Sequence, residues 1–517
     1  MSNANRFRFV FSRVSSLIFV ILLLVLAYIY DFDRILFLGP QSVHMWRQSD
    51  CLSFTLNYYM ENRGLFEPAI NFIGEKGNGQ TVSDFPFLYY IVGKIWQVTG
   101  QHEFIFRGLV LTFFFTGLFF LYRTLTTLFN DRIWAIMVSL MMFTSPVLSY
   151  YSCNFLMEIP ALSLALIGWF FFFRFYQTGQ NKWLWITMLV FTLAGLLKVS
   201  ALLSYFALLG LFVLEWLHLI SFRKDRPVFP EPRKAILPFL TVIVAIVAWF
   251  SFVTIYDNAN NRDFFLVGIL PIWKMTYTEI MIKFDQIKSY WIFLNFPGYF
   301  QLLIVIFWII MAIFPKRNNR IFYYLNLVLA VGVVMYLLLF FQVVAGHDYY
   351  WINLYILLLI TTVSFVYFLK TNLPLAFKWG KIIFVVLLVF NVIYVRKELN
   401  QRYHGANMEY YNLYVKDFKS MKEYNRKLGI KREDFVISIP EGTINASLYY
   451  MDQKGWSAYG KNFQCEEFFR TDIALGAKYL FVSDSTLLKA SYLAPFVKNK
   501  IGQYKSVSVF DLRKLEN

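Results

Sequence analysis

The short charged loop expected after the N-terminal hydrophobic stretch contains residue types that chemistry at a membrane surface requires. It reads HMWRQSD, and within it Arg47 and Asp50 are three residues apart. An aspartate can accept a proton from an attacking hydroxyl or amine, and an arginine can bind a phosphate through two parallel hydrogen bonds. Ionisable groups held at a membrane are costly and are therefore candidates for function, although an ordinary wet loop is an equally common alternative for an isolated aspartate.

Further ionisable residues follow at the ends of the hydrophobic segments, and we assign all of them to the same side of the membrane as Asp50. They are His44, Asp84, Arg107, Glu158, Lys198, His347 and Asp348. Lone charges at helix ends are usually anchors whose charged tips reach water. Because several loops contribute such residues to one side, we expect a single cavity near the outer leaflet. Its cations would suit the phosphate of a lipid, which is the natural substrate at that depth.

The composition indicates what holds these residues in place. Of the 517 residues, 58% are hydrophobic and 21% are aromatic. The hydrophobic residues recur in runs of about 16 to 24, the length needed to cross ~30 Å of hydrocarbon. We predict an α-helical polytopic membrane protein with a cytoplasmic N-terminus, in which the first run is an uncleaved anchor. The eleven predicted spans are 14–31, 104–122, 133–150, 159–174, 183–199, 202–221, 236–256, 298–315, 321–343, 351–370 and 381–396.

The formal net charge of +17 reports mainly on topology and does not indicate nucleic-acid binding. The predicted inner segments carry 18 Lys+Arg against 3 Asp+Glu, whereas the outer segments before residue 396 carry more acidic than basic residues. This is the positive-inside pattern of a cytoplasmic membrane, and it favours a bacterial inner membrane. The inner segments are 1–13, 123–133, 174–183, 222–235, 316–320 and 370–381.

Three segments outside the spans have distinct patterns. Phe85 to Thr99 is apolar, but a full crossing would reverse the charge bias of every later loop, so we predict a re-entrant or interfacial helix. Asp257 to Pro297 alternates apolar and charged residues at helical spacing and predicts an amphipathic helix in the interface. Residues 397–517 contain the strand-like runs FVISI, KYLFVS and SVSVFDL between helical stretches. We therefore expect a transmembrane domain at 1–396 and a small periplasmic α/β domain at 397–517.

Several kinds of site are disfavoured by the motifs that the sequence lacks. It contains no GxxxxGK[ST] loop, so we do not expect cytoplasmic ATP to drive the reaction. Cys51, Cys153 and Cys465 form no CxxC pair and no zinc spacing. A disulfide between Cys51 and Cys153 stays open, because both would face outward. No cofactor is indicated with certainty, and a divalent metal stays open.

Six short motifs occur in order along the chain, and they are WRQSD, SDFPFLYY, QHEFIFR, NFLMEIPAL, LLKVSAL and GHDYYW. They resemble motifs of the GT-C class of membrane glycosyltransferases, and in particular of its protein O-mannosyltransferase and lipid A aminoarabinose transferase branch (glycosyltransferase family 39-like). The resemblance covers most of residues 1–396 in layout. Two positions depart from the family pattern. Asp50 is followed by Cys51, where many relatives have a second acid, and Leu197-Lys198-Val199 stands where a Thr-Lys-Gly turn is expected.

The resemblance implies roles for individual residues. The first-loop acid acts as the catalytic base or orients the acceptor, and this role falls on Asp50. Cations bind the donor phosphate, a role that falls on Lys198 and His347. Further donor-binding candidates are Arg47, Arg107 and Tyr349, and the supporting acids are Asp84 and Glu158.

The function implied is inverting transfer of a sugar from a polyprenyl-phosphate donor to a lipid, glycan or protein on the periplasmic side. A lipid-linked glycan flippase or other transporter is the alternative from another class. A flippase needs charge along the whole pathway, and the inner halves of these spans carry almost none, with Glu215 as an exception. An O-antigen polymerase or ligase would use a large outer loop rich in arginine and histidine. The loop at 257–297 contains Arg262 but no histidine.

Overall fold

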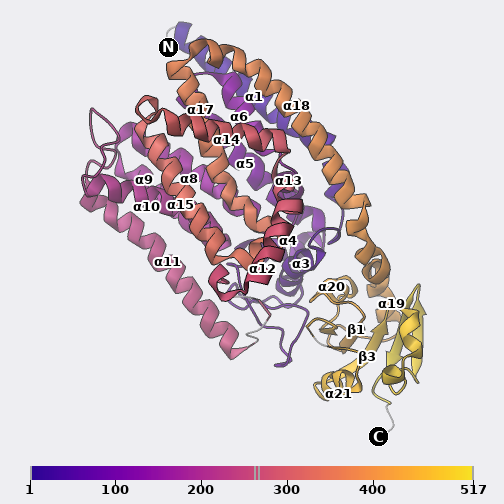
Figure 1. Ribbon diagram of the computed structural model, residues 1–517. Coiled ribbons are helices and arrows are strands. Elements are labelled where there is room, and N and C mark those ends of the chain that lie inside the picture. Colours follow the sequence, from indigo (N-terminus) through magenta and orange to yellow (C-terminus); the bar gives the residue numbers. More distant parts are fainter. Residues whose placement is uncertain (1–2, 261–263, 266–267, 461, 515–517) are drawn as a thin grey trace. The chain divides into compact units, whose positions relative to one another are not determined.

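The computed structural model of the chain describes residues 3–260, 264–265, 268–460 and 462–514 (Figure 1). Contacts between Cα atoms divide the chain into two compact units, each built from segments that are far apart in the sequence. Unit 1 comprises Met1–Phe37, Arg107–Phe250 and Gly268–Leu399. Unit 2 comprises Leu38–Phe106, Ser251–Val267 and Asn400–Asn517. The domain division at 396–397 expected from composition stays a prediction.

Unit 1 is helical, as its hydrophobic runs predict. Pairs of its long helices pack along one another, including α8 with α9, α10 with α15, and α17 with both α14 and α15. Its helices are α1 (Asn3–Ile29), α2 (Phe32–Ile35), α5 (Glu103–Phe129), α6 (Arg132–Met142), α7 (Pro146–Ser152), α8 (Glu158–Thr178), α9 (Asn181–Leu197), α10 (Leu202–Trp216), α11 (Pro232–Ala259), α12 (Tyr277–Gln286), α13 (Ile292–Asn295), α14 (Gly298–Ile313), α15 (Arg320–Leu339), α16 (Phe341–Val344), α17 (Tyr355–Asn372) and α18 (Pro374–His404). Of these, α11 and α18 end in unit 2, and α5 begins there.

The helices agree with the predicted spans, because each of the eleven predicted segments overlaps at least one of them. Among the described residues, seven helices are long and apolar enough to cross a membrane, or up to nine if two bent pairs each count as one span. Two shorter apolar helices occupy Arg13–Ile29 and Asn181–Leu197. The chain is therefore a helical polytopic membrane protein.

One predicted span is broken. The segment 133–150 forms α6 and α7, which meet at an angle of 77°. The side chain of Ser145 accepts a hydrogen bond from the backbone N–H of Leu148, and Pro146 follows at the first position of α7. A serine cap followed by proline starts a new helix, because proline lacks the N–H that would continue the previous one. The hydrophobicity of the run concealed this break.

Unit 2 combines helices with a small mixed sheet, which confirms the predicted α/β character of the tail. The five strands lie in the order β2-β1-β3-β5-β4. β1 is parallel to β2 and β3, while β5 is antiparallel to β3 and β4. The elements are α3 (Met45–Met60), α4 (Phe87–Thr99), α19 (Met421–Lys427), β1 (Phe435–Ile439), α20 (Ala446–Met451), β2 (Gly455–Ser457), α21 (Glu466–Ala474), β3 (Ala477–Val482), β4 (Lys500–Tyr504) and β5 (Val507–Asp511).

The three strands predicted from hydrophobic runs correspond to β1, β3 and β5, which are largely buried. β2 and β4 were not predicted. β2 has only three residues, and the sequence of β4, KIGQY, contains a glycine and is mostly exposed or half-exposed. Strand signals depend on runs of β-branched and aromatic side chains, and neither a three-residue strand nor a run interrupted by glycine provides one.

Candidate functional site

The WRQSD motif lies in a buried helix, which corrects the expectation of a charged loop. His44 precedes α3 in a left-handed conformation, with φ of 53°, and α3 begins at Met45. Arg47, Gln48, Ser49 and Asp50 form its first turns, and all four are buried. The mostly polar sequence suggested exposure. Arg47 and Asp50 instead interact with Asp84 and Asn445 in other parts of unit 2, which no local pattern reveals.

Asp50 is completely buried and is held at only one of its two carboxyl oxygens. Its Oδ1 accepts a hydrogen bond of 2.7 Å from the side-chain amide of Asn445. Its Oδ2 has no hydrogen-bond partner among the residues described. Burial raises the pKa of Asp50 to about 7, although the Arg47 guanidinium and the Asn445 hydrogen bond oppose the rise. A carboxyl with a pKa near neutrality and one available oxygen can serve as a general base.

Asn445 links three backbone segments around Asp50. Its Nδ2 donates to Asp50, while its Oδ1 accepts from the Phe72 backbone N–H at 3.0 Å and lies 3.2 Å from the Ser53 hydroxyl, whose single proton is shared with Asn71. Because the Phe72 N–H holds the amide oxygen, the amide nitrogen points at Asp50. The sequence contained no local signal for this role, since Asn445 lies 395 residues after Asp50.

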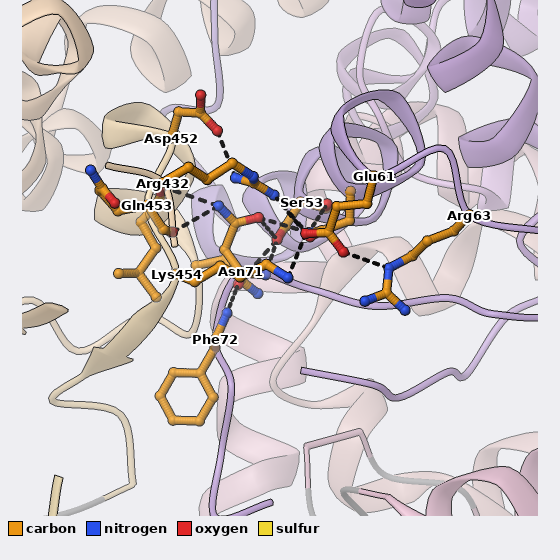
Figure 2. Close-up of polar contacts among 12 residues, drawn as sticks. Ser53, Glu61, Arg63, Asn71, Phe72, Arg432, Asp452, Gln453 and Lys454 are labelled. Carbon is orange, nitrogen blue, oxygen red and sulfur yellow. Dashed lines mark hydrogen bonds and ion pairs between the residues drawn. The ribbon is translucent and has the colours of Figure 1, made fainter. Parts of the chain in front are cut away.

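A stripe of polar residues continues from Asp50 along one face of α3 and beyond its end. Asp50, Ser53, Asn57 and Glu61 recur at intervals of three and four residues, the spacing that places side chains on one helical face. Ser53 donates to the side-chain oxygen of Asn71 at 2.9 Å, and Asn57 donates to the same oxygen at 2.9 Å (Figure 2). This spacing was the one available sequence signal for the network.

The far end of the stripe is an ion-pair network with the C-terminal part of unit 2. Arg432 donates to Asp452 at 2.6 Å and to Asn57 at 2.9 Å, and it lies 3.3 Å from Glu61 (Figure 2). Lys454 forms a second ion pair with Glu61. Arg432 and Asp452 are buried, and a buried pair is costly to break from one side only. The network therefore fixes the face of α3 that carries Asp50.

A second buried carboxyl, Glu441, lies within electrostatic range of Asp50. It accepts hydrogen bonds from the Thr443 backbone N–H at 2.6 Å and from the Ser447 hydroxyl at 2.9 Å. Burial raises the pKa of Glu441, and its proximity contributes to the raised pKa of Asp50. Sequence reasoning missed Glu441 because it lies in the C-terminal segment, where no known motif marks it.

Arg47 and Asp84, both predicted from the sequence, meet in an ion pair of 2.5 Å. The guanidinium of Arg47 also lies 5.2 Å from the centre of the Phe265 ring. Arg47 is 7% exposed, so its charge is held inside unit 2 close to Asp50. Asp84 thus neutralises Arg47 in this structure, and a phosphate at Arg47 would share the guanidinium with Asp84.

In unit 1, Glu158 and Lys198 form an ion pair of 2.7 Å. Glu158 opens α8, and Lys198 occupies the break between α9 and the 3-10 helix Val199–Ala201, where its backbone is extended. The break predicted between the spans 183–199 and 202–221 therefore falls at Lys198. The Lys198 ammonium also lies 5.2 Å from the centre of the Tyr350 ring and 5.9 Å from that of Tyr349.

The GHDYYW motif places aromatic side chains near the Glu158–Lys198 pair in unit 1. His347 stacks on Tyr349 with ring centres 5.3 Å apart, and the rings are nearly parallel. Asp348 accepts a hydrogen bond from the hydroxyl of Tyr151. The structure thus brings together four predicted residues, Glu158, Lys198, His347 and Tyr349. The expectation that they share one cavity with Asp50 concerns both units and stays a prediction.

Arg107 is completely buried near the start of α5. It donates to the backbone carbonyl of Cys153, and its guanidinium lies 4.1 Å from the centre of the Phe155 ring. These contacts hold the segment that precedes Glu158, so Arg107 supports the position of α8. Its predicted role in phosphate binding stays a prediction.

The described part of the chain contains no group of three or more histidine, cysteine, aspartate or glutamate residues arranged to hold a metal ion. Cys51, Cys153 and Cys465 are free. Cys51 instead lies 3.4 Å from the hydroxyl of Tyr89. A disulfide between Cys51 and Cys153 would join unit 2 to unit 1, and that question stays open.

Comparison with known proteins identifies the fold. Neither a family model nor a curated protein matches the sequence. A crystal structure of ArnT from Cupriavidus metallidurans bound to undecaprenyl phosphate superposes with a TM-score of 0.59 at 13% identity, over 97% of this chain and 98% of ArnT. The oligosaccharyltransferase of Archaeoglobus fulgidus gives 0.54 at 13% identity, over 91% of this chain and 69% of the other. Arabinofuranosyltransferase AftD from Mycobacteria gives 0.52 at 12% identity, over 96% and 40%.

These neighbours differ from the chain in most residues but share its architecture of membrane helices. The likeness extends over almost the whole of this chain and of ArnT. The chain therefore has the fold of the GT-C membrane glycosyltransferases, as its motifs predicted.

Proposed function

We propose that this protein is an inverting glycosyltransferase that moves a sugar from a polyprenyl-phosphate carrier to an acceptor. The observation that carries the proposal is the Asp50 carboxyl, which is buried, has a pKa raised to about 7, and offers an unpaired Oδ2. Asn445 leaves Asp50 one orientation. A single well-oriented base is what inversion requires, since the acceptor attacks once and no enzyme-bound sugar intermediate forms.

In the proposed reaction, Asp50 Oδ2 accepts the proton of the acceptor hydroxyl or amine. The acceptor atom bonds to the anomeric carbon on the face opposite the phosphate. The bond between that carbon and the phosphate oxygen breaks, and the lipid phosphate leaves with the electron pair. The charge that develops on the phosphate requires cations, and Lys198, His347 and Arg47 are the residues to which we assign this role.

The Glu158 partner of Lys198 is compatible with phosphate binding. A lysine ammonium has three N–H donors, so an ion pair with Glu158 does not exclude a hydrogen bond to a phosphate. His347 and Tyr349 would contribute an imidazole and a phenol beside it.

The donor class is supported by ArnT, whose crystal structure contains undecaprenyl phosphate and which this chain covers over 98% of its length. We infer a polyprenyl-phosphate sugar for this chain by that analogy and by the cations present. The acceptor would be a lipid, a glycan or a protein at the periplasmic face of a bacterial inner membrane. The GT-C fold is found in enzymes among the neighbours above, which favours transfer over flipping.

A direct assay tests the proposal. The purified full-length chain would be reconstituted in liposomes with radiolabelled polyprenyl-phosphate sugars and a membrane lipid extract. We expect label in an acceptor fraction with the wild type and not with Asp50→Asn, and parallel reactions with a chelator would test for a metal requirement. Movement of the intact labelled lipid across the bilayer, without sugar transfer, would contradict the proposal and favour a flippase.

A further inference from the structure

An apolar cavity of about 240 Å³ lies within unit 1 between the spans α5, α8, α15 and α17. Its walls are mainly leucine, isoleucine and aromatic side chains. They include the last turns of α5 and α8, the first turns of α15 and the part of α17 from Ile356 to Tyr367. This end of the helices is the one predicted to carry the basic inner loops. None of the residues assigned above to glycosyl transfer lines the cavity.

The length of the cavity matches one leaflet of a bilayer. Along α8 its lining runs from Leu166 to Gln177. At a rise of 1.5 Å per residue, this run is about 16 Å long. The hydrocarbon core is ~30 Å thick, so one leaflet contributes about half of that. A single acyl chain of a membrane lipid therefore fits the cavity in both length and polarity.

Cations surround the end of the cavity that faces the predicted inner loops. Arg226 donates to the backbone carbonyls of Gln177 and Tyr176, at 2.7 and 3.2 Å, and both of these residues line the cavity. Lys370 donates to the carbonyl of Leu128 at 3.3 Å and lies 6.0 Å from the centre of the ring of Tyr367, and these residues also line it.

The charge at this rim is not neutralised internally. Arg320 precedes the cavity residue Ile321 and donates to the Ser221 carbonyl at 3.1 Å. Arg223 forms an ion pair with Asp225, so its charge is already neutralised. Within the described ranges, Arg226, Arg320 and Lys370 have no carboxylate partner. Three cations beside an apolar cavity are complementary to a molecule that has an anionic headgroup and an apolar tail.

We propose that unit 1 binds an anionic phospholipid here, with one acyl chain in the cavity and its phosphodiester at Arg226 and Lys370. Basic pockets between membrane helices are suited to such headgroups. The lipid would be a structural or regulatory ligand, distinct from the sugar donor. Glu158 and Gln177 are at opposite ends of α8, about 28 Å apart along the helix axis at 1.5 Å per residue.

Lipid retention by the purified full-length protein tests this inference. The protein would be delipidated in detergent and incubated with dioleoyl phosphatidylglycerol or dioleoyl phosphatidylcholine, and bound lipid would be counted by native mass spectrometry. We expect the phosphatidylglycerol to bind at least tenfold more tightly. The two lipids have identical acyl chains, so equal binding would overturn the proposal.

Variants locate the site. Arg226→Gln combined with Lys370→Gln should weaken phosphatidylglycerol binding about tenfold. The matched control is Lys182→Gln with Lys378→Gln, which removes two exposed cations at the starts of α9 and α18 and should bind as the wild type does. An equal loss in both double variants would indicate general charge attraction and overturn the site. Circular dichroism would verify folding, and the single variants would replace any double variant that fails to fold.

Two further measurements test whether an acyl chain occupies the apolar cavity. Thr124 lines the cavity and is half-buried, so Thr124→Trp should narrow the slot and reduce phosphatidylglycerol binding at least fivefold. Unchanged binding would contradict occupation of the cavity by an acyl chain. Displacement of bound phosphatidylglycerol by an equimolar polyprenyl phosphate would also overturn the proposal, because the cavity would then belong to the tail of the lipid carrier.

Discussion

At the scale of single residues, Asp50 determines the expected pH dependence of activity. A base must be deprotonated, and the pKa of Asp50 is raised to about 7 by burial. We therefore expect kcat/KM to rise as the pH increases through about 7 and to level off above it. Asp50→Asn removes the proton acceptor and should lower turnover roughly 10²–10⁴-fold in a folded protein. A variant that retains more than about half of wild-type turnover would contradict the role of base.

The same residue links activity to stability. An unfolded aspartate ionises near its ordinary pKa of 3.8, whereas the folded one ionises near 7. Between these values the folded state holds more protons than the unfolded state, so its free energy of unfolding falls as the pH rises. Asp50→Asn should therefore stabilise the protein, and by more at pH 8 than at pH 5. Thermal unfolding in detergent at both pH values measures this, and a larger gain at pH 5 would contradict the raised pKa.

Asn445 is expected to act as a positioning residue. Its hydrogen bond to Oδ1 favours the ionised form of Asp50, so Asn445→Ala should shift the pH midpoint of activity upward and reduce kcat. Asn412→Ala, at an exposed asparagine of the same unit, is the control. A midpoint identical to that of the wild type, even with reduced activity, would indicate that Asn445 matters only for folding.

At the scale of elements, the Glu158–Lys198 pair joins the start of α8 to the break after α9. Both side chains are at most 10% exposed. Removing one partner leaves a buried charge uncompensated, so Lys198→Met should destabilise the protein by about 3–5 kcal/mol. Adding Glu158→Gln should restore most of this stability. Equilibrium unfolding of the single and double variants forms the test, and an additive loss in the double variant would contradict coupling.

Activity of the same variants separates structure from catalysis. The Glu158→Gln/Lys198→Met protein should be stable but defective in donor use, because it lacks the cation assigned to the phosphate. A stable double variant with wild-type KM for the donor would remove Lys198 from the proposed site.

Elements were predictable wherever a periodic or hydrophobic run encoded them. The membrane helices and the strands β1, β3 and β5 follow from such runs. The 77° bend before Pro146 was missed because hydrophobicity continues across it. The burial of WRQSD was missed because its partners, such as Asn445, are hundreds of residues away. Pairings of that kind depend on tertiary structure, although the spacing of Ser53, Asn57 and Glu61 on one helical face could have indicated a buried polar stripe.

At the scale of the whole molecule, the orientation in the membrane stays a prediction with a direct test. Basic short loops resist translocation, so we expect Ser221 to be cytoplasmic and Ser485 periplasmic. Single cysteines would be placed at these positions in a Cys465→Ser background, since Cys465 is partly exposed whereas Cys51 and Cys153 are buried. An impermeant thiol reagent, applied to cells with a permeabilised outer membrane, should label position 485 only.

Reversed labelling would mean that Phe85 to Thr99 crosses the bilayer. The helix there, α4, has 13 residues. At 1.5 Å per residue it is about 20 Å long, which is short of a ~30 Å hydrocarbon core. This length supports the re-entrant or interfacial assignment. Reversal would also place Asp50 and Lys198 on opposite sides and end the proposal of a shared cavity.

The 395 residues that separate Asp50 from Asn445 have a consequence for biosynthesis. A ribosome adding ~5–20 residues per second needs about 20–80 s to reach Asn445 after it has made Asp50. During that interval the nascent chain inserts its helices while the carboxyl still lacks its amide partner. The protein would thus be inactive while its helices insert into the membrane. Its activity would begin only when the last quarter of the chain has been translated and has folded.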